Sequence, residues 1–295
     1  MLRHWRSIRA LVAGFLASIA LSSAAVAAPA LWIAKSPTAT IYLFGTMHIL
    51  EPETTWRTPS LDSAYAKATT IWFELDMSSL ADPKVAADLV TRFGFDDAHP
   101  LSTKLDAEHL SALKAVLQHQ GLAFDRIDRM RPWAAALALT ALPMLQAGFD
   151  PKQGADMQLT SSAGADHKAI RAFETVDQQM HLFVDMSPAT EIEFLDDTID
   201  SNTKTNHTTQ GIEAAWVSGD IQKLGQVLIN AMKKRYPEFY ENLIRRRNLA
   251  WSEMLTKELA GSGTELVNVG ALHMVGDEGL PALLKAKGYS VERLQ

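Results

Sequence analysis

The chain has 295 residues, a formal net charge of −6, 47% hydrophobic residues and no cysteine. The absence of cysteine excludes a thiol nucleophile, a disulfide framework and a lipobox for lipid attachment. The acidic balance disfavours nucleic acid as a partner, because an acidic surface repels phosphates. A chain of this length and apolar content can bury a large core as one or two domains.

Residues 1–27 are predicted to form a signal peptide. Arg3, Arg6 and Arg9 give it a basic start, and the apolar stretch that follows is too short for a comfortable membrane span. Residues 25–27, Ala-Val-Ala, have the small-x-small pattern of a cleavage site, although an uncleaved anchor is the alternative. No second apolar run of membrane length follows, so we expect a periplasmic or secreted bacterial protein without a membrane span after signal removal.

The mature chain is predicted to begin with a β-hairpin. Its strands are "LWIAKS" at 31–36 and "TATIYLFGT" at 38–46, joined by a Ser-Pro-Thr turn. A helix over 61–68 then precedes a buried strand, "TTIWFELD", at 69–76.

From about residue 82 to 166 the pattern is mostly helical. The segment "PWAAALALTALPMLQAG" at 132–148 is apolar all round, so we expect a buried helix that Pro143 bends or shortens. "KAIRAFE" at 168–174 returns to a strand, and further helices follow. Between them, "SNTKTNHTTQ" at 201–210 is polar and unpatterned, which predicts a loop.

The chain closes with a strand, a helix and a strand: "TELVNVG", "GLPALLKAKG" and "YSVERL". Strands near both ends with helices between them are typical of an α/β fold. We therefore predict a central mixed, mostly parallel sheet with flanking helices and a large helical insertion, in one domain over residues 28–295.

Two strands end in the same Gly-x-x-His pattern, Gly45 to His48 and Gly270 to His273. Parallel strands joined by helices end at one edge of the sheet, which is where ligands bind in such folds. The glycines would allow a sharp turn or a close backbone approach there. One such motif is weak evidence for a functional site, because a histidine that is only hydrogen-bonded at a strand end gives the same sequence pattern. Two are more informative.

Glu74 and Glu174 each end a further predicted strand and would join the histidines. Two neutral imidazoles with one or two carboxylates suit a divalent transition metal, Mn, Co, Fe or Zn, that makes a bound water nucleophilic. Asp76 could replace Glu74, but Glu74 lies among apolar residues where an unpaired carboxylate would be costly. A strand-end salt bridge is the structural alternative. Either Glu74 or Glu174 would serve as the general base.

Arg247 and Asn248 fall within the apolar stripe of a long predicted helix. A buried arginine needs an anionic partner, so Arg247 could hold a catalytic carboxylate or stabilise a developing oxyanion. A structural ion pair is the alternative. Arg131 is a similar candidate, and Asp156 is expected in the first turn of a helix. The patterns H-E-x-x-H, G-x-S-x-G, G-x-G-x-x-G and the phosphate loop do not occur.

Seven segments, taken in order, resemble the TraB/GumN family, which includes the Tiki metalloproteases. They cover nearly the whole mature chain and read "LWIAKSPTATIYLFGTMH", "TTIWFELD", "MRPWAAALAL", "GFDPKQGADMQLTSSA", "AFETVDQQM", "RRRNLAW" and "LVNVGALHMVGDEGLPALLKAKGYSVERL". The resemblance departs at Ala155, where the family usually has a larger apolar residue.

The resemblance implies a fold similar to that of erythromycin-esterase-like and haem-uptake ChaN-like proteins, with a metal-dependent hydrolytic site. It points to His48, Glu74 and His273 as metal ligands, with Glu174, Arg247, Asp156 and Asn248 as supporting positions. We expect Glu174 and Arg247 to be catalytic and Asp156 and Asn248 to bind substrate, together with Arg131, which the residues alone suggest. Peptidase activity belongs to the Tiki branch, so a peptide or small-molecule substrate is expected here. The alternative is a periplasmic protein that binds haem, glycan or metal, or assists assembly, without turnover.

Overall fold

A computed structural model describes residues 27–76, 88–89, 91–203 and 208–295. The predicted signal peptide, up to residue 26, lies outside these ranges. None of the helices within them is long and apolar enough to cross a membrane.

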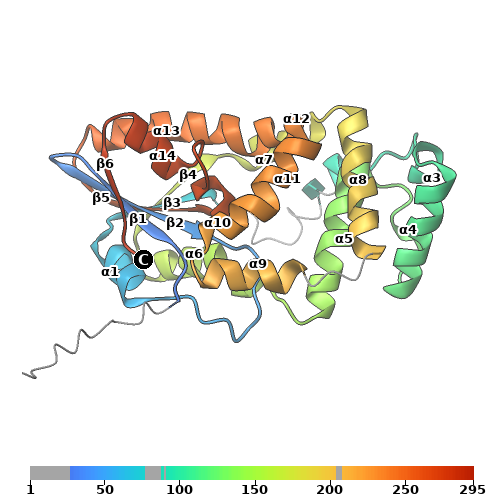
Figure 1. The fold of residues 1–295 in the computed structure, drawn as a ribbon, viewed down its shortest axis with the longest axis horizontal. Coiled ribbons are helices and arrows are strands. Elements are labelled where there is room, and N and C mark those ends of the chain that lie inside the picture. The colour runs from blue at the N-terminus through green and yellow to red at the C-terminus, as the bar shows by residue number, and fades with distance from the viewer. Residues whose placement is uncertain (1–26, 77–87, 90, 204–207) are drawn as a thin grey trace, which may run out of the picture.

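The strands of the described ranges form one six-stranded sheet in the order β4-β3-β5-β2-β1-β6 (Figure 1). The strands are β1 (Leu31–Lys35), β2 (Ala39–Thr46), β3 (Thr70–Leu75), β4 (Ala169–Glu174), β5 (Gly263–Gly270) and β6 (Ser290–Arg293). Strands β2 to β5 pair in parallel, whereas β1 is antiparallel to both β2 and β6. The predicted mixed, mostly parallel sheet and its opening hairpin are confirmed.

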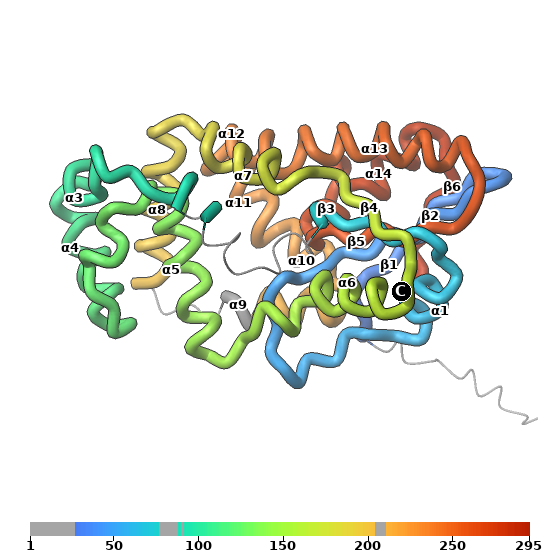
Figure 2. Tube along the Cα trace, turned by 180° about the vertical axis from the view of Figure 1, so that it is seen from behind, coloured from blue at the N-terminus to red at the C-terminus, as the bar shows by residue number. Residues whose placement is uncertain are grey.

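Helices cover both faces of the sheet, because alternate residues of each strand point to opposite sides. Phe73 of β3 joins one apolar core, and its neighbour Trp72 joins the other. The first core is closed by α1 (Pro59–Lys67), α6 (Ala155–Ala165) and α9 (Thr208–Val217), and the second by α13 (Arg246–Leu259) and α14 (Leu280–Ala286). Figure 2 shows α1 and α6 together on the face opposite α13. The α/β fold class is therefore confirmed.

A helical lobe lies at one end of the elongated molecule (Figure 1). It has an apolar core of its own, in which Leu113, Leu139 and Leu195 are buried. Its helices are α3 (Leu101–Lys104), α4 (Ala107–His119), α5 (Pro132–Gln146) and α8 (Pro188–Thr203). Further helices run between lobe and sheet: α7 (Val176–Val184), α10 (Ile221–Leu224), α11 (Asn230–Arg235) and α12 (Pro237–Tyr240). This is the predicted helical insertion.

Two local predictions were wrong. The apolar helix α5 is not buried all round, because Leu137 and Leu145 are exposed and no residue of this helix after Leu139 is fully buried. Pro143 lies within the helix without ending it. The described residues of the predicted loop at 201–210 are helical, because α8 continues to residue 203 and α9 begins at 208. Residues 204–207 of that prediction lie outside the described ranges.

The segment after β2 is fixed by the start of α6. The amide of Ala155 donates a hydrogen bond to the carbonyl oxygen of Met47, 2.9 Å away. Gly154 packs so closely that a Cβ atom there would lie 2.2 Å from the carbonyl oxygen of His48. A side chain at 154 would therefore displace the His48 backbone.

Gly154→Ala is expected to destabilise the protein by about 2–3 kcal/mol, because the added methyl group meets backbone that has little room to move. Gly164→Ala, within the helix that Gly154 precedes, is the control, since a Cβ there meets nothing within 4 Å. The control should stabilise by about 0.5–1 kcal/mol, the ordinary helix preference for alanine. Denaturant unfolding followed by circular dichroism measures both, and equal stability of the two variants would show that the packing at Gly154 is not restrictive.

Candidate active site

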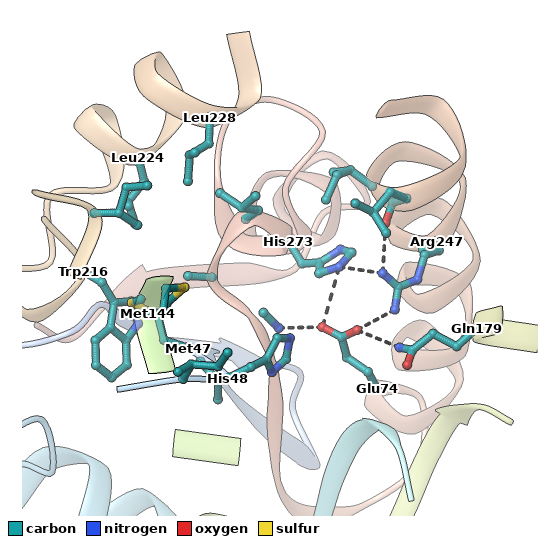
Figure 3. A pocket seen from close by; sticks show the side chains of 18 of the residues that line it. Met47, His48, Glu74, Met144, Gln179, Trp216, Leu224, Leu228, Arg247 and His273 are labelled. Carbon is teal, nitrogen blue, oxygen red and sulfur yellow. Dashed lines mark hydrogen bonds and ion pairs between the residues drawn. The ribbon is translucent and has the colours of Figure 1, made fainter. Parts of the chain in front are cut away.

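The carboxyl ends of the four parallel strands meet at one edge of the sheet. Thr46 at the end of β2 pairs with Gly270 of β5, and Leu75 of β3 pairs with Glu174 of β4. Beyond this edge lies a pocket of about 480 Å³ (Figure 3). One end of it is polar, with the side chains of Thr46, His48, Glu74, Gln179, Arg247 and His273.

Gly270 lies where the two histidines and the carboxylate approach the backbone. A Cβ atom at this position would lie 3.1 Å from Oε1 of Glu74 and 3.7 Å from both Nε2 of His48 and Cδ2 of His273. The amide of Gly270 donates a hydrogen bond to Oε1 of Glu74 at 2.7 Å. The close approach predicted for this glycine is thus present, and it lets both imidazoles reach one end of the pocket.

Arg247 is the central buried cation of the site, with 6% of its side chain exposed. Its Nη2 atom donates to Oε2 of Glu74 at 2.5 Å, and its Nε and Nη2 atoms donate to the two oxygens of Glu174 at 2.8 and 2.9 Å. Its Nη1 atom lies 3.0 Å from Nε2 of His273. One guanidinium group therefore joins two carboxylates and an imidazole, which its planar set of donors allows.

Glu74 is held in its ionised form. Besides Arg247 and Gly270, it accepts a hydrogen bond at 3.2 Å from Nε2 of Gln179 on α7. Burial raises the pKa of Glu74, but Arg247, His273 and His48 outweigh it and hold the pKa well below the ordinary value for glutamate. The pocket therefore contains a carboxylate anion.

His273 is buried and neutral. Its Nδ1 atom lies 2.6 Å from Oδ1 of Asn248, which can only accept, so we assign the ring proton to Nδ1. The lone pair of Nε2 then faces Arg247. Burial lowers the pKa of His273 to about 3, with Arg247 adding to the effect and Glu74 opposing it.

His48 lies in the segment after β2, with 61% of its side chain accessible. Its Nδ1 atom lies 3.0 Å from Oδ1 of Asp156, in the first turn of α6. Burial lowers the pKa of His48, but the carboxylates of Asp156 and Glu74 outweigh it and raise the pKa to about 9. Much of the His48 ring is accessible to solvent, so the contact with Asp156, rather than burial, decides the direction in which the pKa of His48 shifts. Near neutral pH, His48 is therefore protonated while His273 is neutral.

The pocket does not include every residue predicted for the site. His48, Glu74, Arg247 and His273 line it, whereas Glu174 lies behind Arg247 and opens onto a different hollow.

Three residues predicted to bind substrate do not line this pocket. Asn248 is fully buried against His273, and Asp156 contacts His48 from behind. Arg131 pairs with Glu191, and both line a separate hollow in the helical lobe. The position of these side chains makes Asn248 and Asp156 supports for the histidine rings rather than substrate ligands.

Gln179 and the apolar walls of the pocket were not predicted from the sequence. Thr175 and Gln178 form a capping box at the start of α7, directly after β4. That motif places the first turns of α7 beside the strand ends and could have indicated Gln179. The apolar walls gave no separate signal, because a helix stripe that lines a pocket has the same pattern as one that faces a core.

Arg247→Met is expected to destabilise the protein by about 3–5 kcal/mol at neutral pH, because it leaves two buried carboxylates without their cation. The loss should shrink as the pH falls toward the ordinary pKa of glutamate, about 4.3, because the carboxylates then bind protons. Denaturant unfolding at several pH values measures this.

Arg246→Met is the neighbouring control, since 69% of the Arg246 side chain is exposed and its contact with Glu241 is 3.4 Å long. It should cost less than about 1 kcal/mol at any pH. Similar losses in the two variants would contradict a central role for Arg247 in the stability of the site.

The chain is similar in sequence to known proteins. No solved structure matches the chain. The uncharacterized protein YbaP of Escherichia coli K12 is 26% identical over 185 residues, which cover 63% of this chain and 68% of YbaP. YbaP of Shigella flexneri matches to the same extent. The model of the TraB/PrgY/gumN family matches residues 30–293. The chain therefore belongs to the TraB/PrgY/gumN family.

Proposed function

We propose that the protein is an exported, metal-dependent hydrolase that cleaves a peptide bond or a related amide or ester bond. The observation that carries this proposal is the pairing of His48 and His273 at one end of a pocket, beside the ionised Glu74. The two histidines lie at opposite ends of the described chain, so their meeting depends on the whole fold. Export rests on residues 1–27 alone.

The side chains fit a divalent metal ion in kind. Each histidine has its Nδ1 atom held by an oxygen, from Asp156 or Asn248, an arrangement that orients metal-binding imidazoles through Nε2. Glu74 adds a carboxylate oxygen beside them. His48, Glu74 and His273 would hold the ion, and Mn, Co, Fe or Zn would suit this set.

Two changes are required: His48, which is protonated near neutral pH, would have to lose its proton, and Arg247 would have to move. Within the described ranges, no three His, Asp or Glu side chains stand close enough to bind an ion as they are. Arg247 donates to Nε2 of His273 and so occupies the lone pair that the metal needs. Arg247 would have to leave His273, while its two bonds to Glu174 could remain.

The bound ion would make a water molecule more acidic and polarise the carbonyl group of the substrate. Arg247 would stabilise the negative charge that develops on the carbonyl oxygen. Glu74 is the better candidate for the general base, because it lines the pocket beside both histidines, whereas Glu174 lies behind Arg247 and opens onto a different hollow. Glu174 would instead position Arg247.

Ligand binding without turnover is the second candidate. Two observations favour it. Most of the pocket wall is apolar. The polar atoms of Glu74, Arg247 and His273 already bond to one another. Such a protein would hold a haem, glycan or metal ligand, or assist assembly, in the same pocket.

His48→Ala and His273→Ala are each expected to abolish binding of one equivalent of Mn²⁺, Co²⁺ or Zn²⁺ while the protein stays folded. Isothermal titration and elemental analysis of protein purified without chelator measure this. His181→Ala is the control, since His181 lies on α7 with 44% of its side chain exposed, outside the pocket. Metal binding unchanged in both site variants would reject the proposed metal site.

Hydrolysis is measured separately, with a peptide library and each ion. Turnover that disappears in His48→Ala, His273→Ala and Glu74→Gln supports the hydrolase. Metal binding without turnover of any library member favours the second candidate.

A further inference from the structure

The pocket is divided into a polar end and a much larger apolar part. Figure 3 shows Met144, Trp216, Leu224 and Leu228 on the side opposite Arg247 and Gln179, with the two histidines between them. Besides these four, the apolar lining includes Phe183, Leu243 and Ile244.

The apolar part offers a ligand few hydrogen-bonding groups. The indole Nε1 of Trp216 already donates to the carbonyl oxygen of Gly45 at 2.7 Å. The other side chains named above carry no N–H or O–H group, and most of the wall is helical, where backbone groups bond within the helix. A peptide backbone buried there would leave N–H and C=O groups without partners, which is costly.

The volume and the side chains of the apolar walls suit a flexible apolar ligand. The volume of about 480 Å³ lies in the range of small-molecule sites. Two π-helical turns, Gly225–Ile229 and Glu241–Arg245, supply Leu228, Leu243 and Ile244 to the wall, and such turns are frequent at functional sites. Methionine and leucine side chains can adapt to a flexible ligand.

We infer that the pocket binds its substrate by one long apolar group, an acyl chain or a large apolar side chain, joined to an amide or ester carbonyl at the polar end. Only one part of this inference, the hydrolysis of the amide or ester bond, rests on the proposed function. Hydrolysis would add the hydroxyl group of water to the carbonyl carbon and a proton to the leaving amine or alcohol.

Binding is tested without turnover by titrating the metal-free protein with two series of neutral amides. One series is N-acyl glycinamides from butanoyl to dodecanoyl, and the other is N-acetyl amides of alanine, leucine, phenylalanine and tryptophan. Affinity should rise about fourfold per added methylene until the cavity is full. A larger gain in the first series identifies an acyl chain, and a larger gain in the second identifies a side chain.

Met144→Glu and Leu228→Glu should each weaken binding of the longest tight ligand by about tenfold or more, because a carboxylate is introduced into the apolar wall. Both residues are only partly buried, so the folded state should survive. Leu249→Glu is the control, since Leu249 is exposed on α13 and does not line the pocket. Leu228→Trp should shorten the longest chain that still gains affinity.

These outcomes separate the inference from the proposed function. Chain-length-dependent binding that survives in His48→Ala, with no hydrolysis by the wild type, would retain the inference and remove the hydrolase. Affinity that does not depend on apolar length, or that Met144→Glu and Leu228→Glu leave unchanged, would overturn the inference even if peptides are hydrolysed.

Discussion

The buried guanidinium of Arg247 joins the parts of the molecule on which the site depends. It binds Glu74 on β3, Glu174 on β4 and His273 after β5, from its own position on α13. Two carboxylates could not be buried at the sheet edge without a cation between them. The same contacts set the charge states of the site, because they keep Glu74 ionised and help to keep His273 neutral.

Much of this arrangement could be predicted from the sequence, since it follows from strong periodic signals and from topology. The strands have alternating or continuous apolar patterns, and parallel strands must end at one edge. Gly45 and Gly270 therefore indicated where the histidines lie. Arg247 stood out because a charged residue in an apolar helix stripe needs a buried partner.

Other features could not be predicted, because they depend on which elements meet. The sequence of an apolar helix such as α5 has the same pattern whether the second half of the helix is buried or borders a pocket. Polarity at 201–210 does not exclude helix when the neighbouring helices extend into it. Asn248 and Asp156 were placed near the chemistry, but only the contacts show that each holds a histidine ring.

The metal-free arrangement and the proposed hydrolase differ in the proton on His48 and at the contact between Arg247 and Nε2 of His273. Anomalous diffraction from crystals soaked in Mn²⁺ tests this most directly. The proposal predicts one strong peak bound by Nε2 of His48, Nε2 of His273 and Glu74, with Arg247 withdrawn from His273 and still on Glu174. A structure in Mn²⁺ with Arg247 still on His273 and no peak in the pocket would contradict it.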